Sequence, residues 1–148
     1  MNDAALGILA CSGEMLESRL GKKLKLIIAD DTPAMLRNIF SLLETEFDVV
    51  STAENGQLAF ECARRCLPDV AVLDLGMPLL NGMEVTRKLS SLGPVPAVVI
   101  CSVESAPEII EAARQAGAFG YVLKQHMARD LITAVKSAAT GKWFVSSL

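Results

Sequence analysis

The 148-residue sequence has no excess of positive charge and no long apolar run. Its 14 basic and 17 acidic side chains give a net charge of −3, which argues against a protein that holds nucleic acid through charge alone. No apolar stretch approaches the roughly 20 residues of a membrane-spanning helix. The short apolar stretch near the first residue follows Asp3 rather than a basic side chain, unlike a secretion signal. We therefore expect a cytoplasmic protein that does not enter a membrane.

Paired cysteine motifs are also missing. The four cysteines, at positions 11, 62, 66 and 101, form no CxxC pair, which argues against a secreted disulfide framework and favours a reducing compartment. Cys62 and Cys66 lie four residues apart on one face of an expected helix. They either pack in the core or chelate a metal, although a structural zinc site needs a second pair of ligands.

The sequence is instead rich in apolar residues, which make up 51% of the chain. A chain of this length can bury a core without disulfides or metal ions. Regular patterns begin near residue 23 and end near residue 141. We expect one folded domain over 23–141, an N-terminal extension over 1–22 that is flexible or forms one short helix, and a tail or linker start over 142–148.

Short apolar runs alternate with helical stripes along this domain. The expected strands cover residues 24–29, 49–53, 70–73, 97–101 and 119–123, and the helical stripes cover 33–43, 58–66, 85–92, 108–116 and 131–138. Runs without polar alternation are typical of strands buried on both faces of a parallel sheet. The pattern predicts an α/β fold, a doubly wound (βα)5 domain with a five-stranded parallel sheet.

Polar residues follow these strands at one edge of the predicted sheet. Asp30 and Asp31 follow the first strand, Asp74 the third, Ser102 the fourth and Lys124 the fifth. Ligands of open parallel sheets bind at this carboxyl edge. Taken singly, each residue has an ordinary role as a loop, cap or solvated side chain. Together, three carboxylates repel one another, and a divalent cation with Lys124 would offset that repulsion.

The chemistry of this cluster points to phosphorus. Carboxylate oxygens with room for water suit Mg²⁺ rather than Zn²⁺. A carboxylate backed by Mg²⁺ and an ammonium group can attack phosphorus and form an aspartyl phosphate. Asp74 is the expected nucleophile because it ends a middle strand, and Asp30 and Asp31 would hold the metal.

Several blocks of the sequence resemble the receiver domain of two-component response regulators. They are IADD at 28–31, VLDLGMP at 72–78, Gly82, VICS at 99–102 and GYVLK at 120–124. The resemblance implies a flavodoxin-like fold and a phosphorelay signalling role, with Asp74 as phosphoacceptor. The donor would be a phosphohistidine on a sensor histidine kinase or a histidine phosphotransfer protein.

The resemblance also assigns roles to individual residues. It implies Asp31, Asp74 and the backbone carbonyl of Gly76 as Mg²⁺ ligands, with Asp30 assisting. Lys124 would contact the phosphoryl group and Ser102 would hydrogen-bond to it. Tyr121 would be the switch aromatic that turns inward when Ser102 moves. The contact that depends on phosphorylation, with a second copy of the chain or another partner, would lie over residues 108–116, 119–123 and 129–140.

The sequence departs from the common receiver pattern in three places. Val103 follows the switch hydroxyl where many receivers carry Ala or Gly, and it narrows access to the site. Gly76 places no side chain over the site. Gln125 replaces the usual proline after Lys124, and the residues that follow are similar to LuxR/FixJ-type regulators. Those regulators continue into a DNA-binding domain, but we expect no DNA binding by this chain alone.

Two alternatives to a phosphoaccepting receiver stay open. A haloacid-dehalogenase-like phosphohydrolase also forms an aspartyl phosphate, but on an Asp-x-Asp motif after its first strand. A pseudo-receiver would act as an interaction module without phosphorylation. A nucleotide-binding domain is disfavoured because no GxGxxG motif follows the first strand and the sequence has no GxxxxGK[ST] motif. We expect a signalling protein whose catalysis is limited to its own phosphorylation and slow dephosphorylation.

Overall fold

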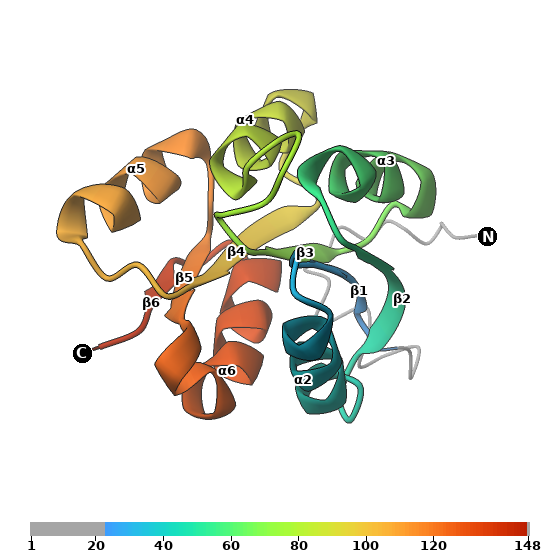
Figure 1. The fold of residues 1–148 in the computed structure, drawn as a ribbon, viewed down its shortest axis with the longest axis horizontal. Coiled ribbons are helices and arrows are strands. Elements are labelled where there is room, and N and C mark those ends of the chain that lie inside the picture. Colours follow the sequence, from blue (N-terminus) through green and yellow to red (C-terminus); the bar gives the residue numbers. More distant parts are fainter. Residues whose placement is uncertain (1–22, 148) are drawn as a thin grey trace.

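The computed structural model describes residues 23–147 as an α/β sandwich with a parallel sheet at its centre (Figure 1). The strands are β1 (Lys25–Ala29), β2 (Asp48–Ala53), β3 (Val70–Leu73), β4 (Ala97–Ser102), β5 (Gly120–Leu123) and β6 (Phe144–Val145). They lie in the order β2-β1-β3-β4-β5-β6, and every neighbouring pair is parallel. The expected doubly wound parallel architecture is confirmed.

Helices cover both faces of the sheet. They are α2 (Pro33–Leu43), α3 (Gly56–Cys66), α4 (Gly82–Leu92), α5 (Pro107–Ala116) and α6 (Met127–Ala139), with a 3-10 turn, η1 (Lys124–His126), before the last. Helices α2 and α6 lie on one face, and α3, α4 and α5 lie on the other (Figure 1). This arrangement follows from right-handed crossovers between parallel strands.

The strand sequences divide their side chains between the two faces. In β1, Leu26 and Ile28 pack with the α2 and α6 core, whereas Ile27 and Ala29 pack with the α3, α4 and α5 core. All residues of β3, β4 and β5 are buried. Burial on both faces explains why these strands read as continuous apolar runs.

The sheet has a sixth strand where five were expected. Gly141 takes a φ of 78° after α6, and the chain then returns along β5. The Phe144 amide donates to the Phe119 carbonyl at 3.1 Å, and the Ser146 amide donates to the Tyr121 carbonyl at 3.0 Å. A two-residue strand has too few positions to show a period in the sequence, so β6 appears only through this pairing.

Part of the chain lies outside the described residues, including the expected extension over 1–22 and Cys11. Within residues 23–147, no helix is long and apolar enough to cross a membrane. Cys62 is buried in the core beside Ser51, with 3.3 Å between Sγ and Oγ. The thiols of Cys62, Cys66 and Cys101 are free.

Candidate functional site

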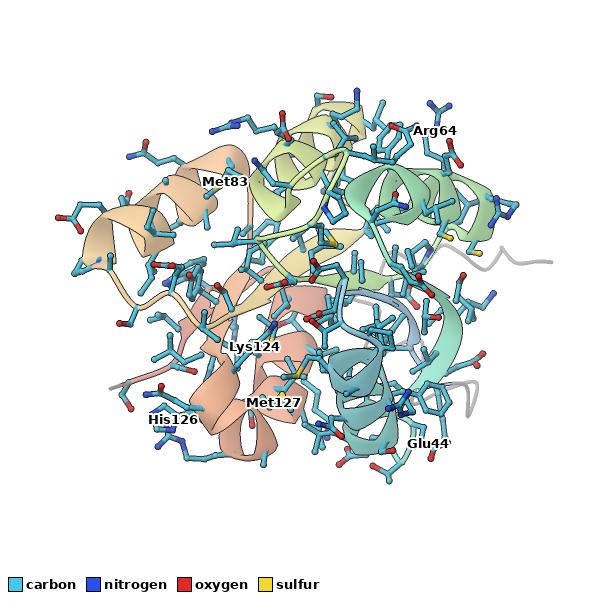
Figure 2. All side chains as sticks on the ribbon, viewed as in Figure 1. Glu44, Arg64, Met83, Lys124, His126 and Met127 are labelled. Carbon is cyan, nitrogen blue, oxygen red and sulfur yellow. The ribbon has the colours of Figure 1, made fainter. Side chains whose placement is uncertain are left out.

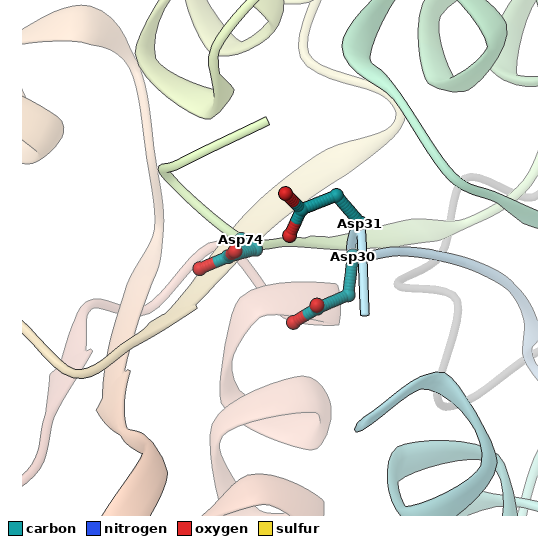
Figure 3. Close-up of side chains that lie close together, drawn as sticks. All are labelled: Asp30, Asp31 and Asp74. Carbon is teal, nitrogen blue, oxygen red and sulfur yellow. The ribbon is translucent and has the colours of Figure 1, made fainter. Parts of the chain in front are cut away.

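Three carboxylates meet at the carboxyl edge of the sheet. Asp30 and Asp31 follow β1, and Asp74 follows β3, which pairs with β1 up to Ala29 and Leu73. Each carboxylate has an oxygen within 4.8 Å of the others (Figure 3). In residues 23–147 this is the one cluster of three or more acidic, histidine or cysteine side chains suited to a metal ion.

The three carboxylates differ in burial, which separates their roles. Asp30 is fully buried, Asp74 is largely buried and Asp31 is exposed. One oxygen of Asp30 accepts a hydrogen bond from the Thr32 amide at 2.9 Å. Asp30 is therefore fixed in place by the turn that starts α2, while Asp31 faces solvent.

Lys124 joins two of these carboxylates. Its ammonium nitrogen lies 2.8 Å from Oδ2 of Asp30 and 3.3 Å from Oδ1 of Asp74. In Figure 2 it lies at the middle of the domain, whereas Glu44 and Arg64 lie at the periphery. It stands directly after β5, so the end of that strand sets where the ammonium reaches.

The charges of this cluster shift one another's protonation. Burial raises the pKa of Asp74, and the charge of Asp30 adds to that effect, while Lys124 opposes it. Burial alone would lower the pKa of Lys124, but the hydrogen bond that its ammonium donates to Asp30 and the charges of Asp74 and Asp30 together raise it. Lys124 is thus held as a cation, and its charge only partly offsets the cost of the negative charge on Asp74.

The donor set fits Mg²⁺. All three side chains offer carboxylate oxygens, and Asp31 is open to solvent, which leaves room for metal-bound water. A second positive charge beside Lys124 would offset the burial and the repulsion from Asp30, which together raise the pKa of Asp74.

Ser102 and Tyr121 meet at the loop after β4. Ser102 is buried at the end of β4, and its Oγ accepts from the Glu104 amide at 3.1 Å. The Tyr121 ring is fully buried, and its hydroxyl donates to the Glu104 carbonyl at 2.8 Å. Burial raises the pKa of Tyr121, so it stays a neutral donor. The tyrosine therefore already lies inside, bound to the same loop residue as Ser102.

A groove of about 540 Å³ opens over Asp74. It is lined by Asp74, Leu75, Gly76, Asn81, Met83, Ser102, Val103, Glu104, Ile109 and Lys124. Val103 is 72% exposed and lines the groove. A Cβ on Gly76 would meet nothing within 4 Å, so that side of the groove is open.

The loop between β3 and α4 is folded closely against Asp74. A Cβ on Gly82 would lie 2.2 Å from the Asp74 carbonyl oxygen, so this position requires glycine. Asn81 caps α4 through a reciprocal pair of 2.9 Å hydrogen bonds with Glu84. The cap and the glycine together hold the loop that carries Gly76.

Five residues of this site were predicted from the sequence, and one neighbouring pair of polar side chains was not. Asp30, Asp31, Asp74 and Lys124 lie together, and Ser102 lines the same groove. The missed group is Asp130 and Ser146, both buried and joined by a 2.7 Å hydrogen bond behind the end of β5. An acidic residue in a first helical turn and a serine in a tail gave no sequence signal of this contact.

A family model and the relatives of this chain point to the same protein family. A family model described as the response regulator receiver domain matches residues 26–136. The transcriptional regulatory protein LnrK of Bacillus subtilis is 37% identical over 120 residues, which cover 80% of this chain and 54% of LnrK. The nitrate/nitrite response regulator NarL of Escherichia coli K12 is 34% identical over 123 residues, which cover 82% of this chain and 57% of NarL. The chain therefore spans little more than half the length of these relatives.

Solved structures agree with these relatives. The signal receiver domain of the response regulator NarL from Mycobacterium tuberculosis superposes with a TM-score of 0.77 at 31% identity, covering 82% of this chain and 99% of that one. The isolated receiver domain of RcsB from Salmonella enterica, determined with the phosphomimetic BeF3⁻, has a TM-score of 0.77 at 26% identity. That match covers 85% of this chain and 95% of the RcsB chain.

Proposed function

The chain belongs to the response regulator receiver domain family of two-component signalling, and we propose that it takes a phosphoryl group from a partner's phosphohistidine onto Asp74. The observation that carries this proposal is the position of Lys124, between Asp30 and Asp74 at the edge of the groove. The donor would be a sensor histidine kinase or a histidine phosphotransfer protein. The domain would cover residues 23–141, and β6, which lies beyond that range, adds the sixth strand to its sheet.

The burial of each carboxylate supports Asp74 as the nucleophile. Asp30 is fully buried and bonded to Lys124 and the Thr32 amide, so it cannot approach phosphorus. Asp74 faces the groove, which is large enough for a phosphoryl group. Its carboxylate oxygen would form the bond to phosphorus while the phosphorus–nitrogen bond breaks, and the electron pair of that bond stays with the leaving imidazole.

The remaining residues would stabilise charge on the phosphoryl oxygens. Lys124 would donate from one side, and the Ser102 hydroxyl from the other. Asp31 and Asp74 with the Gly76 carbonyl, assisted by Asp30, would hold Mg²⁺, which supplies further positive charge to those oxygens when bound. The open space beside Gly76 would let water reach the phosphoryl group and limit its lifetime.

Phosphorylation would change the surface through Ser102 and Tyr121. If Ser102 rotates to donate its hydroxyl to the phosphoryl group, its Oγ would move relative to the Glu104 amide that it accepts from, and a shift of Glu104 would disturb the hydrogen bond from Tyr121. Because Tyr121 already lies inside, the switch would act on the loop after β4 and the face of α5, β5 and α6. That face would carry a phosphorylation-dependent contact, with a second copy of the chain or with another partner. We expect no DNA binding by this chain alone and a cytoplasmic location.

The test is phosphorylation by acetyl phosphate with Mg²⁺, followed by intact mass. The wild type should gain one phosphoryl group, Asp74→Asn should gain none, and Asp48→Asn, an exposed aspartate on β2, should behave as wild type. A phosphoryl group on the Asp74→Asn protein would overturn the assignment. Sustained turnover of a generic phosphate ester would favour the phosphohydrolase, and a wild type that gains nothing would favour the pseudo-receiver.

A further inference from the structure

A buried polar group lies behind the phosphoryl-accepting site and has no part in the chemistry proposed above. Ser146 is 7% exposed and Asp130 is 8% exposed. The Ser146 hydroxyl donates to Oδ2 of Asp130 at 2.7 Å. Buried polar side chains cost stability unless they are paired. The bond between Ser146 and Asp130 is such a pair, and it attaches the C-terminal segment to α6.

Ser146 binds the backbone of β5 at two points. Its amide donates to the Tyr121 carbonyl at 3.0 Å, and its Oγ accepts from the Leu123 amide at 3.2 Å. Leu123 directly precedes Lys124. The one serine therefore holds β5 between the buried tyrosine and the lysine that bridges two carboxylates.

Asp130 is itself anchored. Arg129 donates to both of its oxygens at 2.9 Å, and the same guanidinium donates to the Ser147 carbonyl at 3.1 Å. Upstream, the ring of Trp143 packs under Arg114 of α5, with 5.1 Å between the guanidinium carbon and the ring centroid. The segment 142–147 is thus fastened to β5, to α6 and to α5.

We propose that Ser146, held by Asp130, is a positioning residue for Lys124, and that through it the segment 142–147 and the Asp74 pocket bias one another. Fixing the end of β5 fixes the point from which the lysine reaches the carboxylates. By linkage, whatever strengthens the hold of Lys124 on a ligand at Asp74 also strengthens the seating of β6. The coupling rests on the proposed function, whereas the positioning does not.

The positioning is tested by the reactivity of the Lys124 amine in the ligand-free protein. Acetylation is followed by mass spectrometry, with exposed Lys88 as the internal reference. In Ser146→Ala, Lys124 should be acetylated about fivefold faster than in wild type, the factor expected for one lost buried hydrogen bond. Ser147→Ala is the matched control, because the Ser147 contact with Arg129 uses only its backbone carbonyl. Ser146→Thr, which keeps the hydroxyl, should restore slow labelling.

The coupling is tested with beryllofluoride and Mg²⁺, followed by the fluorescence of Trp143, the one tryptophan of the chain. Half-saturation should need about fivefold more beryllofluoride in Ser146→Ala than in wild type or Ser147→Ala. In the wild type, beryllofluoride should also slow exchange of the Leu123 and Phe144 amides.

The outcomes separate the two ideas. Equal rates of Lys124 labelling in wild type and Ser146→Ala overturn the positioning. So does labelling that is fast in Ser146→Ala and equally fast in Ser146→Thr. Equal beryllofluoride affinities overturn the coupling. If the wild type accepts neither beryllofluoride nor phosphoryl groups, the proposed function and the coupling fail together, while the labelling result still decides the positioning.

Discussion

Ser102 and Tyr121 are joined through one backbone residue, Glu104, whose amide donates to the serine hydroxyl and whose carbonyl accepts from the tyrosine hydroxyl, at 3.1 and 2.8 Å. The two residues lie on adjacent strands, β4 and β5. Any movement of the Glu104 backbone therefore alters a hydrogen bond on both strands.

Removal of the tyrosine hydroxyl should loosen this loop without emptying the core. Tyr121→Phe keeps the buried ring and loses the bond to Glu104, so the free energy of unfolding should fall by about 0.5–1.5 kcal/mol in urea titration. Tyr121→Ala should cost about 3–5 kcal/mol, because it also leaves a cavity. Exchange of the Glu104 amide should quicken in Tyr121→Phe; unchanged exchange would show that the hydroxyl does not hold the loop.

Mg²⁺ affinity should depend on Asp31 although that residue is exposed. Asp31→Asn removes a charged oxygen from the cluster, and the dissociation constant from isothermal titration should rise at least about tenfold, within the range seen when metal sites are disturbed. Asp48→Asn, which makes the same change at an exposed position on β2, should leave the constant unaltered. Equal affinities in Asp31→Asn and wild type would remove Asp31 from the metal site.

Lys124 should be essential for stability when Mg²⁺ is absent. Lys124→Ala leaves the fully buried Asp30 carboxylate without its cationic partner, a change that typically costs about 3–5 kcal/mol. The loss is measured by urea unfolding in the presence of a chelator. The double variant Lys124→Ala with Asp30→Asn should recover part of it, because the uncompensated charge is gone. A loss below about 1 kcal/mol in the single variant would contradict the buried pairing.

Asp130 should stabilise the protein at neutral pH, and this stabilisation should be lost in acid. The hydrogen bonds from Arg129 lower its pKa, and Ser146 and the charge of His126 add to this against the effect of burial. A carboxyl whose folded pKa lies below its unfolded value of about 3.9 stabilises fully above that value and loses the stabilisation as the pH falls through the folded pKa.

Asp130→Asn should therefore lower the midpoint of thermal unfolding at neutral pH and flatten its decline in acid. The comparison is Asp74→Asn, since burial raises the pKa of Asp74 and gives the opposite sign. Without Mg²⁺, Asp74→Asn should raise stability at neutral pH. The same acid decline in wild type and Asp130→Asn would show that Asp130 contributes nothing to it.

The sheet and its acidic edge were predictable because each signal lies within a few neighbouring residues. Apolar runs that end on Asp30, Asp74 and Lys124 identify buried parallel strands and also place those side chains at one edge. The first residue of α2, Pro33, and the left-handed residue that ends α5, Gly117, are of the types that favour these positions, which are also local features.

The parts that were not predictable depend on contacts between distant positions. Ser146 and Asp130 are 16 residues apart and belong to segments with no shared period. Gly82 belongs to the blocks that resemble receiver domains, but what requires glycine there is the approach of the Asp74 carbonyl, which only the folded chain brings near. Such contacts arise from packing and leave no pattern in a single sequence.

The short strand β6 also affects how the domain behaves in a crowded solution. Strand β5, with the sequence GYVL, is wholly buried, and without β6 its backbone groups would form an open sheet edge. Open apolar edges are templates for pairing with strands of other molecules, and a very short outer strand is one of the ways in which proteins close them. Phe144 and Val145 therefore occupy the edge that β5 would otherwise expose, and the same two residues attach the C-terminal segment to the domain.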